Sequence, residues 1–199
     1  MIILDCAQLS EQWFSERCGV PSASNFDKIV TTTGAPSKQA QKYLYTLAGE
    51  RITQKKEETY QNAIMQRGIE MEAEARKMYE LLEGVEVQQV GICFPDEKKL
   101  YACSPDGLVG DDGGLEIKCP IISTHVGYLL GGKLSQSYFQ QIQGAMLITG
   151  RKWWSILSYY PGMNPFMEKV ERDEVFIGKL ETALREFCIE LSKIVNKIK

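Results

Sequence analysis

Acids and a lysine stand close together in residues 104–120, SPDGLVGDDGGLEIKCP. Asp106 precedes one short apolar stretch, and Glu116 and Lys118 lie two positions apart in a second. Because strand side chains alternate between faces, Glu116 and Lys118 are expected on one face and Ile117 on the other. Carboxylates and the Ile117 backbone carbonyl can hold hard cations such as Mg²⁺. A neighbouring lysine can orient or deprotonate water, since nearby cations lower its pKa. The pattern predicts metal-assisted phosphodiester hydrolysis.

The same pattern also fits a solvent-facing hairpin whose acid and base pair with neighbours and whose Asp106 belongs to a turn. Asp-x9-Glu-x-Lys is permissive by itself, so its surroundings must decide. Glu72 lies in a predicted helix before the hairpin, from which a third carboxylate can reach the same edge. Tyr138 and Gln141 share one side of the predicted helix that follows. These neighbours favour the chemical interpretation.

Bulk properties limit the classes of protein to consider. A chain of 199 residues with ordinary composition is enough for one compact domain, residues 1–199. No stretch approaches the roughly 20 apolar residues that span a bilayer, and the first residues contain no basic leader. We therefore expect a cytoplasmic protein without membrane contact, and most of the six scattered cysteines are expected to be reduced and buried. His125 is the one histidine, so any metal must be held mainly by oxygen.

Charge is unevenly distributed along the chain. The formal net charge of −3 argues weakly against nonspecific coating of nucleic acid. Between residues 37 and 56, however, five basic residues face one acid, Glu50. The five are Lys38, Lys42, Arg51, Lys55 and Lys56. They can form either a phosphate-facing patch or the solvated surface of a helix.

Helices and strands must bring the candidate residues together. Helix formers and apolar spacing predict two short N-terminal helical segments, a loop at 31–37 and helices at 38–55, 68–83, 121–131 and 136–148. Asp173 is the predicted N-cap of a final amphipathic helix. Predicted strands lie at 85–94 and 101–104, in the hairpin, and from Trp153 and Phe166, with residues 111–114 as the hairpin turn. This order predicts an α/β or α+β domain with a central mixed sheet flanked by helices.

Four segments carry a resemblance to a known family. They are WFSERCGVPSAS, RGIEMEAEAR, CSPDGL…GLEIKCP and YFQQIQGAM, in that order. With them the chain, from about residue 13 to residue 172, resembles the lambda exonuclease-like (YqaJ-like viral recombinase) family of the PD-(D/E)XK nuclease superfamily. The resemblance implies a restriction-endonuclease-like core around the predicted sheet.

The resemblance also implies roles for individual residues. Asp106, Glu116 and the Ile117 backbone carbonyl would be metal ligands, with Glu72 contacting the metal directly or through water. Lys118 would position or activate the attacking water. Residues matching a pocket for a 5′-terminal phosphate are Arg17, Ser24, Ser104 and Gln141, with Tyr138 beside it. Arginine, hydroxyl and amide donors suit phosphate oxygens on physical grounds as well. For each residue alone, the alternatives are a surface charge at Arg17, an N-cap at Ser24 and an exposed helix position at Gln141.

By this resemblance the protein is an alkaline-type deoxyribonuclease. It would be a 5′→3′ exonuclease that degrades one strand of linear double-stranded DNA and leaves 3′ tails for recombination by strand annealing. The implied cofactor is Mg²⁺, two per active site, with Mn²⁺ as a substitute. The implied partners are double-stranded DNA ends, a single-strand annealing protein and two further copies of the chain in a homotrimeric ring. Met65 is a candidate apolar wedge between the strands, and the setting would be a bacterial cytoplasm if the gene is phage-derived.

Two other functions fit the same residues. A structure-specific endonuclease could use the same core, but only an end-acting enzyme needs a pocket for a terminal phosphate. A noncatalytic DNA-end-binding adaptor would need a broken metal site, whereas Asp106, Glu116 and Lys118 are all present.

Overall fold

A five-stranded mixed sheet forms the centre of the computed structural model, which describes residues 1–56 and 63–199 and the side chains of 1–56 and 66–199. The strands lie in the order β2-β4-β5-β6-β7. Their bounds are β2 Val87–Gln88, β4 Gly107–Val109, β5 Gly113–Lys118, β6 Trp153–Ser158 and β7 Phe166–Glu171. β5 and β6 run parallel, and the other neighbours run antiparallel. The predicted mixed sheet and its central hairpin are confirmed.

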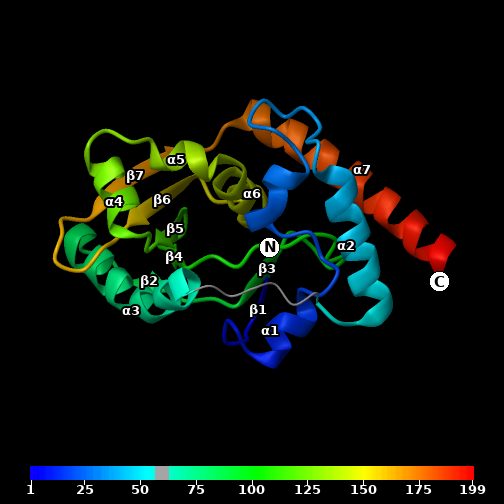
Figure 1. The fold of residues 1–199 in the computed structure, drawn as a ribbon, viewed down its shortest axis with the longest axis horizontal. Helices are drawn as coiled ribbons and strands as arrows, with labels where there is room; N and C mark the ends of the chain where they lie inside the picture. The colour runs from blue at the N-terminus through cyan, green and yellow to red at the C-terminus, as the bar shows by residue number, and fades with distance from the viewer. Residues whose placement is uncertain (57–62) are drawn as a thin grey trace.

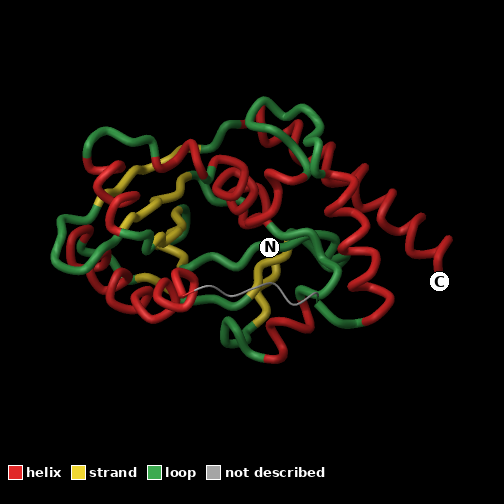
Figure 2. The backbone as a smooth tube through the Cα atoms, viewed as in Figure 1, coloured by secondary structure: helices red, strands yellow, loops and turns green. Residues whose placement is uncertain are grey.

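Helices cover both faces of this sheet (Figures 1 and 2). The helices are α1 Glu11–Glu16, the 3-10 helix η1 Ala23–Lys28, α2 Ala40–Thr53, α3 Ala63–Glu83, α4 Ile122–Leu129, α5 Leu134–Ser137, α6 Phe139–Thr149 and α7 Glu174–Ile198. α3 packs on one face through Ala75 and Tyr79, which meet Leu115 and Ile117 of β5. α6 packs on the other face, where Met146 belongs to the same core as residues of β4 and β6. The hairpin is thus held between two helices.

The predicted strand at 85–94 is wrong, because the segment contributes two strands to two different sheets. β2 pairs with β4, whereas β3 (Ile92–Phe94) pairs with β1 (Ile2–Leu4) in a separate antiparallel pair. Gly91, between them, lies so close to the backbone of Leu4 and Cys6 that a Cβ would have no room. This close contact directs the chain away from the central sheet.

The predicted strand at 101–104 is also wrong. Ala102 and Cys103 form only isolated bridges, to Ser22 and Cys93 respectively. Ser22 belongs to no strand, and Cys93 lies in β3 but shares only this single bridge with Cys103. The segment is nevertheless fixed by backbone hydrogen bonds at both residues, and it leads directly into Ser104.

Helix predictions hold with changed boundaries. The helix predicted from Gly68 begins earlier, at Ala63, and ends before Gly84, which has φ +65°. The helix predicted at 136–148 is two helices that meet at Tyr138, whose φ of −124° interrupts the helical backbone. Asp173 caps the last helix as predicted, since its side chain accepts from Phe176 N at 2.9 Å.

Two glycines predicted to lie in the hairpin turn belong instead to β5. A Cβ on Gly113 or Gly114 would overlap the indole rings of Trp153 and Trp154 on the neighbouring strand. The parallel register places each glycine directly beside one of these tryptophans. Glycine is therefore required here by close packing, and the turn shortens to residues 110–112.

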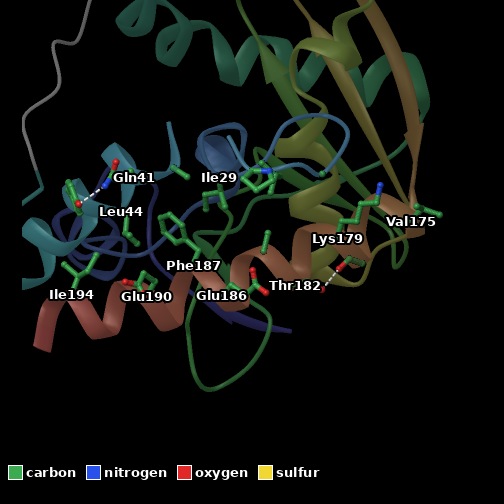
Figure 3. A pocket seen from close by; sticks show the side chains of 17 residues that line it. Ile29, Gln41, Leu44, Val175, Lys179, Thr182, Glu186, Phe187, Glu190 and Ile194 are labelled. Atoms are coloured by element: carbon green, nitrogen blue, oxygen red, sulfur yellow. Dashed lines mark hydrogen bonds between the residues drawn. The ribbon is translucent and has the colours of Figure 1, made fainter. Parts of the chain in front are cut away.

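The fold has other features besides the sheet and the helices that flank it. A groove of about 1020 Å³ lies between α2, α7 and the loop at 31–37, and it is lined in part by Leu44 and Phe187 (Figure 3). His125 is fully buried and contacts Ser158 Oγ at 2.8 Å and the Asn164 carbonyl at 3.0 Å. All six cysteines are free thiols. No helix in the described ranges 1–56 and 63–199 has the length and hydropathy needed to cross a bilayer.

Candidate active site

The β4–β5 hairpin places Asp106 beside the end of β5. Pairing between the two strands stops at Gly107 and Leu115, so Ile117 extends past the end of β4. Asp106 takes the place of a strand partner there, because its Oδ2 accepts from Ile117 N at 2.6 Å. This contact holds the Asp106 carboxylate next to the segment that contains Glu116 and Lys118.

Glu116 and Lys118 lie on the face of β5 that α6 covers, opposite Leu115 and Ile117, as the strand alternation predicts. Lys118 Nζ donates to Glu116 Oε1 at 2.7 Å, and Gln141 Nε2 from α6 donates to the same oxygen at 2.6 Å. Glu116 is only 5% exposed. The solvent-facing alternative for the hairpin therefore does not describe this acid, which is buried with a cation and an amide.

Opposing effects act on the ammonium group of Lys118. Burial alone would lower the pKa of Lys118, but the carboxylates of Glu116 and Asp106 outweigh that effect and raise it above its ordinary value. Lys118 Nζ also lies 4.3 Å from the centre of the Tyr138 ring, a cation–π contact. The side chain is therefore protonated at neutral pH and fixed in position by an acid and an aromatic ring.

Glu72 approaches the same edge from α3, on the other face of the sheet. It pairs with Arg76, one helical turn along, and Arg76 Nε in turn donates to the Asp106 carbonyl at 3.3 Å. Burial is the main cause of a raised pKa at Glu72, and Glu116 adds to it while Arg76 opposes it. Burial likewise raises the pKa of Asp106 well above its usual range, with further repulsion from Glu116 and Glu72. Three carboxylates thus repel one another across this edge.

Repelling carboxylates of this kind are suited to a divalent cation. In the part of the chain that the structure describes, no three acidic, histidine or cysteine side chains converge as a ready-made metal cage. Mg²⁺, however, usually binds through one or two carboxylates and keeps several waters. Asp106 and Glu116, with the main chain of Ile117 beyond the end of β4, supply that kind of donor set. The residues fit a magnesium-type cation.

A second cluster surrounds Arg17, at the end of α1. Arg17 Nη1 donates to Ser104 Oγ at 2.8 Å, and the Trp13 indole N–H donates to the same oxygen at 3.1 Å. The guanidinium carbon lies 4.1 Å from the centre of the Trp13 ring, so the ring supports the cation from one side. Burial lowers the pKa of Arg17, yet arginine stays charged at any physiological pH.

A cavity of about 50 Å³, the Arg17 cavity, lies between this cluster and the acids. Its polar lining comprises Arg17, Ser22, Ser24, Ser104, Glu116 and Gln141. The space is enough for a few water molecules or a group the size of phosphate. All four residues predicted for the phosphate pocket are therefore brought together, from α1, η1, the segment before β4 and α6. Tyr138 does not line the cavity and instead contacts Lys118.

Sequence reasoning assigns no role to three polar residues of this region. Helical spacing places Arg76 on the same side as Glu72, and Trp13 lies four positions before Arg17, so the same spacing could have paired those two. Ser22 Oγ lies 3.3 Å from Ser24 Oγ and lines the Arg17 cavity, but no spacing distinguishes it from other loop serines. The proposed wedge, Met65, lies in α3 with a side chain outside the described residues.

Comparison with known proteins gives this geometry a context. The family model for the YqaJ-like viral recombinase domain matches residues 12–152, which include every candidate site residue. The chain belongs to the YqaJ-like viral recombinase family. No curated protein sequence matches it significantly.

Solved structures agree with membership of the YqaJ-like family. An alkaline exonuclease (LHK-Exo) from Laribacter hongkongensis is 35% identical over 95% of this chain and 96% of its own, with a TM-score of 0.86. The same protein in complex with dAMP gives an equal TM-score. A phage-related exonuclease from Haemophilus somnus, 14% identical over 90% of this chain and 96% of its own, matches with a TM-score of 0.72 and shows the shared fold. Family and fold together identify the chain as a nuclease with a PD-(D/E)XK-like core.

Proposed function

We propose that this YqaJ-family chain is a Mg²⁺-dependent 5′→3′ exonuclease that degrades one strand of linear double-stranded DNA. The observation that carries the proposal is the Arg17 cavity, a phosphate-sized space that touches Glu116 directly. An enzyme that cuts within a chain has no need to bind a terminal phosphate beside its acids. The similar alkaline exonuclease was solved with dAMP, a mononucleotide of the kind that exonucleases release.

The metal would be held by Asp106, Glu116 and the Ile117 backbone carbonyl, with Glu72 reaching it directly or through water. Bound there, two Mg²⁺ ions, or Mn²⁺ in their place, would stabilise the charge that develops on the attacking and leaving oxygens. Burial is the main cause of the raised pKa of Asp106 and of Glu72, and binding would relieve the repulsion among the carboxylates that adds to it. Arg76 would keep Glu72 oriented toward the edge.

Lys118 would hold the attacking water. Its protonated amine donates to Glu116 at 2.7 Å and to Gln141 Oε1 at 3.4 Å and lies against the Tyr138 ring, so the third N–H bond has a fixed direction. A donor of this kind orients a water lone pair away from itself and toward the phosphorus. A cation held by Asp106 and Glu116 would weaken the effect by which these carboxylates raise the pKa of Lys118, and Lys118 that has released its proton to solvent could then accept one from the water.

Gln141 would join the two halves of the site. Its amide nitrogen donates to Glu116 at 2.6 Å, and the same side chain lines the Arg17 cavity. A phosphate in that cavity would accept from Arg17 and from the hydroxyls of Ser24 and Ser104, the donors best suited to a doubly charged group. The position of the terminal phosphate would thereby fix which phosphodiester bond lies beside the acids.

Two proposals on assembly follow from the family rather than from residues of the site. Three copies would form a ring around DNA, with the basic residues between 38 and 56 as candidates for its lining, and degradation would leave 3′ tails for a single-strand annealing protein. A ring would also account for DNA binding by a chain with a net charge of −3, since a channel raises the local potential. The bacterial cytoplasm remains the proposed location.

One assay tests the central proposal. Linear duplex DNA labelled at its 3′ ends, with or without 5′-phosphate, is incubated with Mg²⁺ or with a chelator, and closed circular DNA serves as the control. We expect rapid digestion of the phosphorylated duplex with Mg²⁺, slower digestion of the hydroxyl-ended duplex, and none with the chelator. Equal cleavage of circular DNA would support the endonuclease instead. Binding to DNA ends without any cleavage would support the adaptor.

A further inference from the structure

A larger hollow adjoins the Arg17 cavity. This hollow, the basic pocket, has a volume of about 470 Å³ and is enclosed by η1 and α2 with Lys56 beyond them. Arg17 and Ser22 line both spaces. The Arg17 cavity touches Glu116, whereas the basic pocket does not. The order of groups is therefore catalytic acids, Arg17 cavity, basic pocket.

Positive charge dominates the basic pocket. Lys28, Lys42 and Lys56 line it together with Arg17, and Glu50 is the one acid among its lining residues. Glu50 is buried and accepts the backbone N–H of Gly19 at 2.8 Å. Within the described chain none of these three lysines forms an ion pair. Their charges are available to an anion.

Arg17 connects the two spaces chemically. One nitrogen of its guanidinium donates to Ser104, and its buried Nε has no hydrogen-bond partner among the described residues. A buried N–H without a partner is unfavourable unless a ligand or water satisfies it. Because the guanidinium carries five donors in one plane, it can contact two adjacent phosphate groups at once.

We propose that the basic pocket binds a second phosphate group attached directly to the first, so that the protein accepts polyphosphorylated 5′ ends. This inference rests on the proposed binding of a 5′-terminal phosphate in the Arg17 cavity. A terminal phosphate in the Arg17 cavity would have the scissile bond on the side of Glu116. A further phosphate attached to it on the opposite side would therefore enter the basic pocket. Three lysines without an ion pair among the described residues suit a di- or triphosphate, which carries more negative charge than a monophosphate. The same chemistry could come from a DNA end or from a free nucleoside triphosphate.

Binding in the presence of a chelator tests this separately from cleavage. Duplexes labelled with fluorescein at a 3′ end and carrying 5′-hydroxyl, 5′-monophosphate or 5′-triphosphate are titrated with protein, and fluorescence anisotropy gives each Kd. We expect the triphosphate duplex to bind roughly tenfold more tightly than the monophosphate duplex, the size of one charge-assisted contact. In a second titration, dATP and dAMP each compete with the labelled duplex. If the pocket also binds free nucleotides, dATP should compete about tenfold more strongly than dAMP. A dATP ratio of one, with the duplex ratio retained, assigns the site to DNA ends.

Lys42→Gln and Lys28→Gln test the pocket itself, with Lys197→Gln as the matched control. Lys42 and Lys197 are both exposed, and Lys197 lines none of the hollows described above. The ratio of Kd for the monophosphate duplex to Kd for the triphosphate duplex should fall toward one in the pocket variants. It should stay near tenfold in the control. Taking a ratio removes the general loss of attraction to DNA that any lost charge produces.

Two outcomes overturn the inference. The basic pocket is only a solvated helix surface if wild-type protein binds monophosphate and triphosphate ends equally, or if Lys197→Gln reduces the ratio as much as Lys42→Gln does. Failure of the proposed function has a different signature. In that case the hydroxyl and monophosphate duplexes have equal Kd values, and Arg17→Ala changes neither Kd.

Discussion

The acids at the end of β5 and the Arg17 cavity lie side by side but compensate their charges in opposite ways. Each anion at the acidic edge has a partner: Glu116 contacts Lys118 at 2.7 Å, Glu72 pairs with Arg76, and Asp106 accepts a backbone N–H at 2.6 Å. Arg17, in contrast, contacts a hydroxyl and an aromatic ring and forms no ion pair within the described residues.

This difference separates two binding problems. At the acidic edge, side-chain and backbone donors now occupy oxygens that a cation would use, so a bound metal would have to replace these partners. In the Arg17 cavity an incoming phosphate meets a cation that has not been neutralised. We therefore expect substitutions at the acidic edge to change the rate of cleavage and the stability of the fold, and substitutions around Arg17 to change the choice of DNA end.

Among the substitutions that test the difference between the two regions, Lys118→Ala should produce the largest change in cleavage rate. Loss of the ammonium removes the group proposed to hold water, so cleavage of phosphorylated linear duplex should fall by about 10²–10⁴-fold, the usual contribution of such a group. Binding to the same duplex, measured by anisotropy with a chelator, should persist. Lys197→Ala, on the exposed end of α7, should cleave at the wild-type rate. A Lys118→Ala protein within threefold of wild type would exclude this role.

Arg17→Ala should produce the next largest effect, and one confined to phosphorylated ends. Loss of a charge-assisted contact to phosphate is worth about 1.5–3 kcal/mol, which corresponds to roughly 10- to 150-fold in rate at limiting substrate. Digestion of hydroxyl-ended duplex should be nearly unchanged, so the preference for 5′-phosphate disappears. Arg17→Lys should restore only part of that preference, since an ammonium lacks the planar fork. If Arg17→Ala slows digestion of both duplexes equally, Arg17 stabilises the fold rather than binding the 5′-phosphate.

The sequence predicts a region well when its residues lie close together along the chain, and poorly when they come from distant segments. The acidic edge depends on the alternation of Glu116 and Lys118 and on a hairpin only a few residues long, both local properties that residues 104–120 make plain. The Arg17 cavity joins four segments, and their meeting depends on tertiary packing that no local pattern specifies. Family resemblance, rather than spacing, brought Arg17, Ser24, Ser104 and Gln141 together.

The wrong predictions have the same origin. Residues 85–94 have the composition of one strand, but contact with Leu4 and Cys6, more than eighty positions away, divides them between two sheets. Gly113 and Gly114 resemble a turn because glycine usually marks one. They are strand residues because Trp153 and Trp154 lie against them. In both cases a distant partner overrides the local preference.

Two carboxylate-to-amide substitutions at the acidic edge should have opposite effects on the melting temperature of the metal-free protein. Asp106→Asn removes a charge that burial disfavours most and that Glu116 and Glu72 also repel, while the amide oxygen can still accept from Ile117 N. The melting temperature should rise by about 2–4 °C for each kcal/mol gained. Glu116→Gln leaves the Lys118 ammonium buried without its anion, so the melting temperature should fall. A fall in both variants would mean that hydrogen bonding, not repulsion, dominates at Asp106.

Trp13→Phe should give the smallest effect and is the finest test of the Arg17 cavity. Phenylalanine keeps an aromatic ring beneath the guanidinium but removes the indole N–H that donates to Ser104 at 3.1 Å. Ser104 Oγ then loses one of two donors, and its hydroxyl is held less firmly toward the cavity. A hydrogen bond of this kind contributes about 0.5–1.5 kcal/mol, so KM for phosphorylated ends should rise by roughly 2- to 12-fold while kcat stays constant. Ser104→Ala should raise KM by at least as much, because it removes the hydroxyl itself, whereas Trp13→Phe removes only one of the two donors that hold it. If Trp13→Phe lowers kcat instead, Trp13 acts on the acidic edge, and the separation between the two regions does not hold.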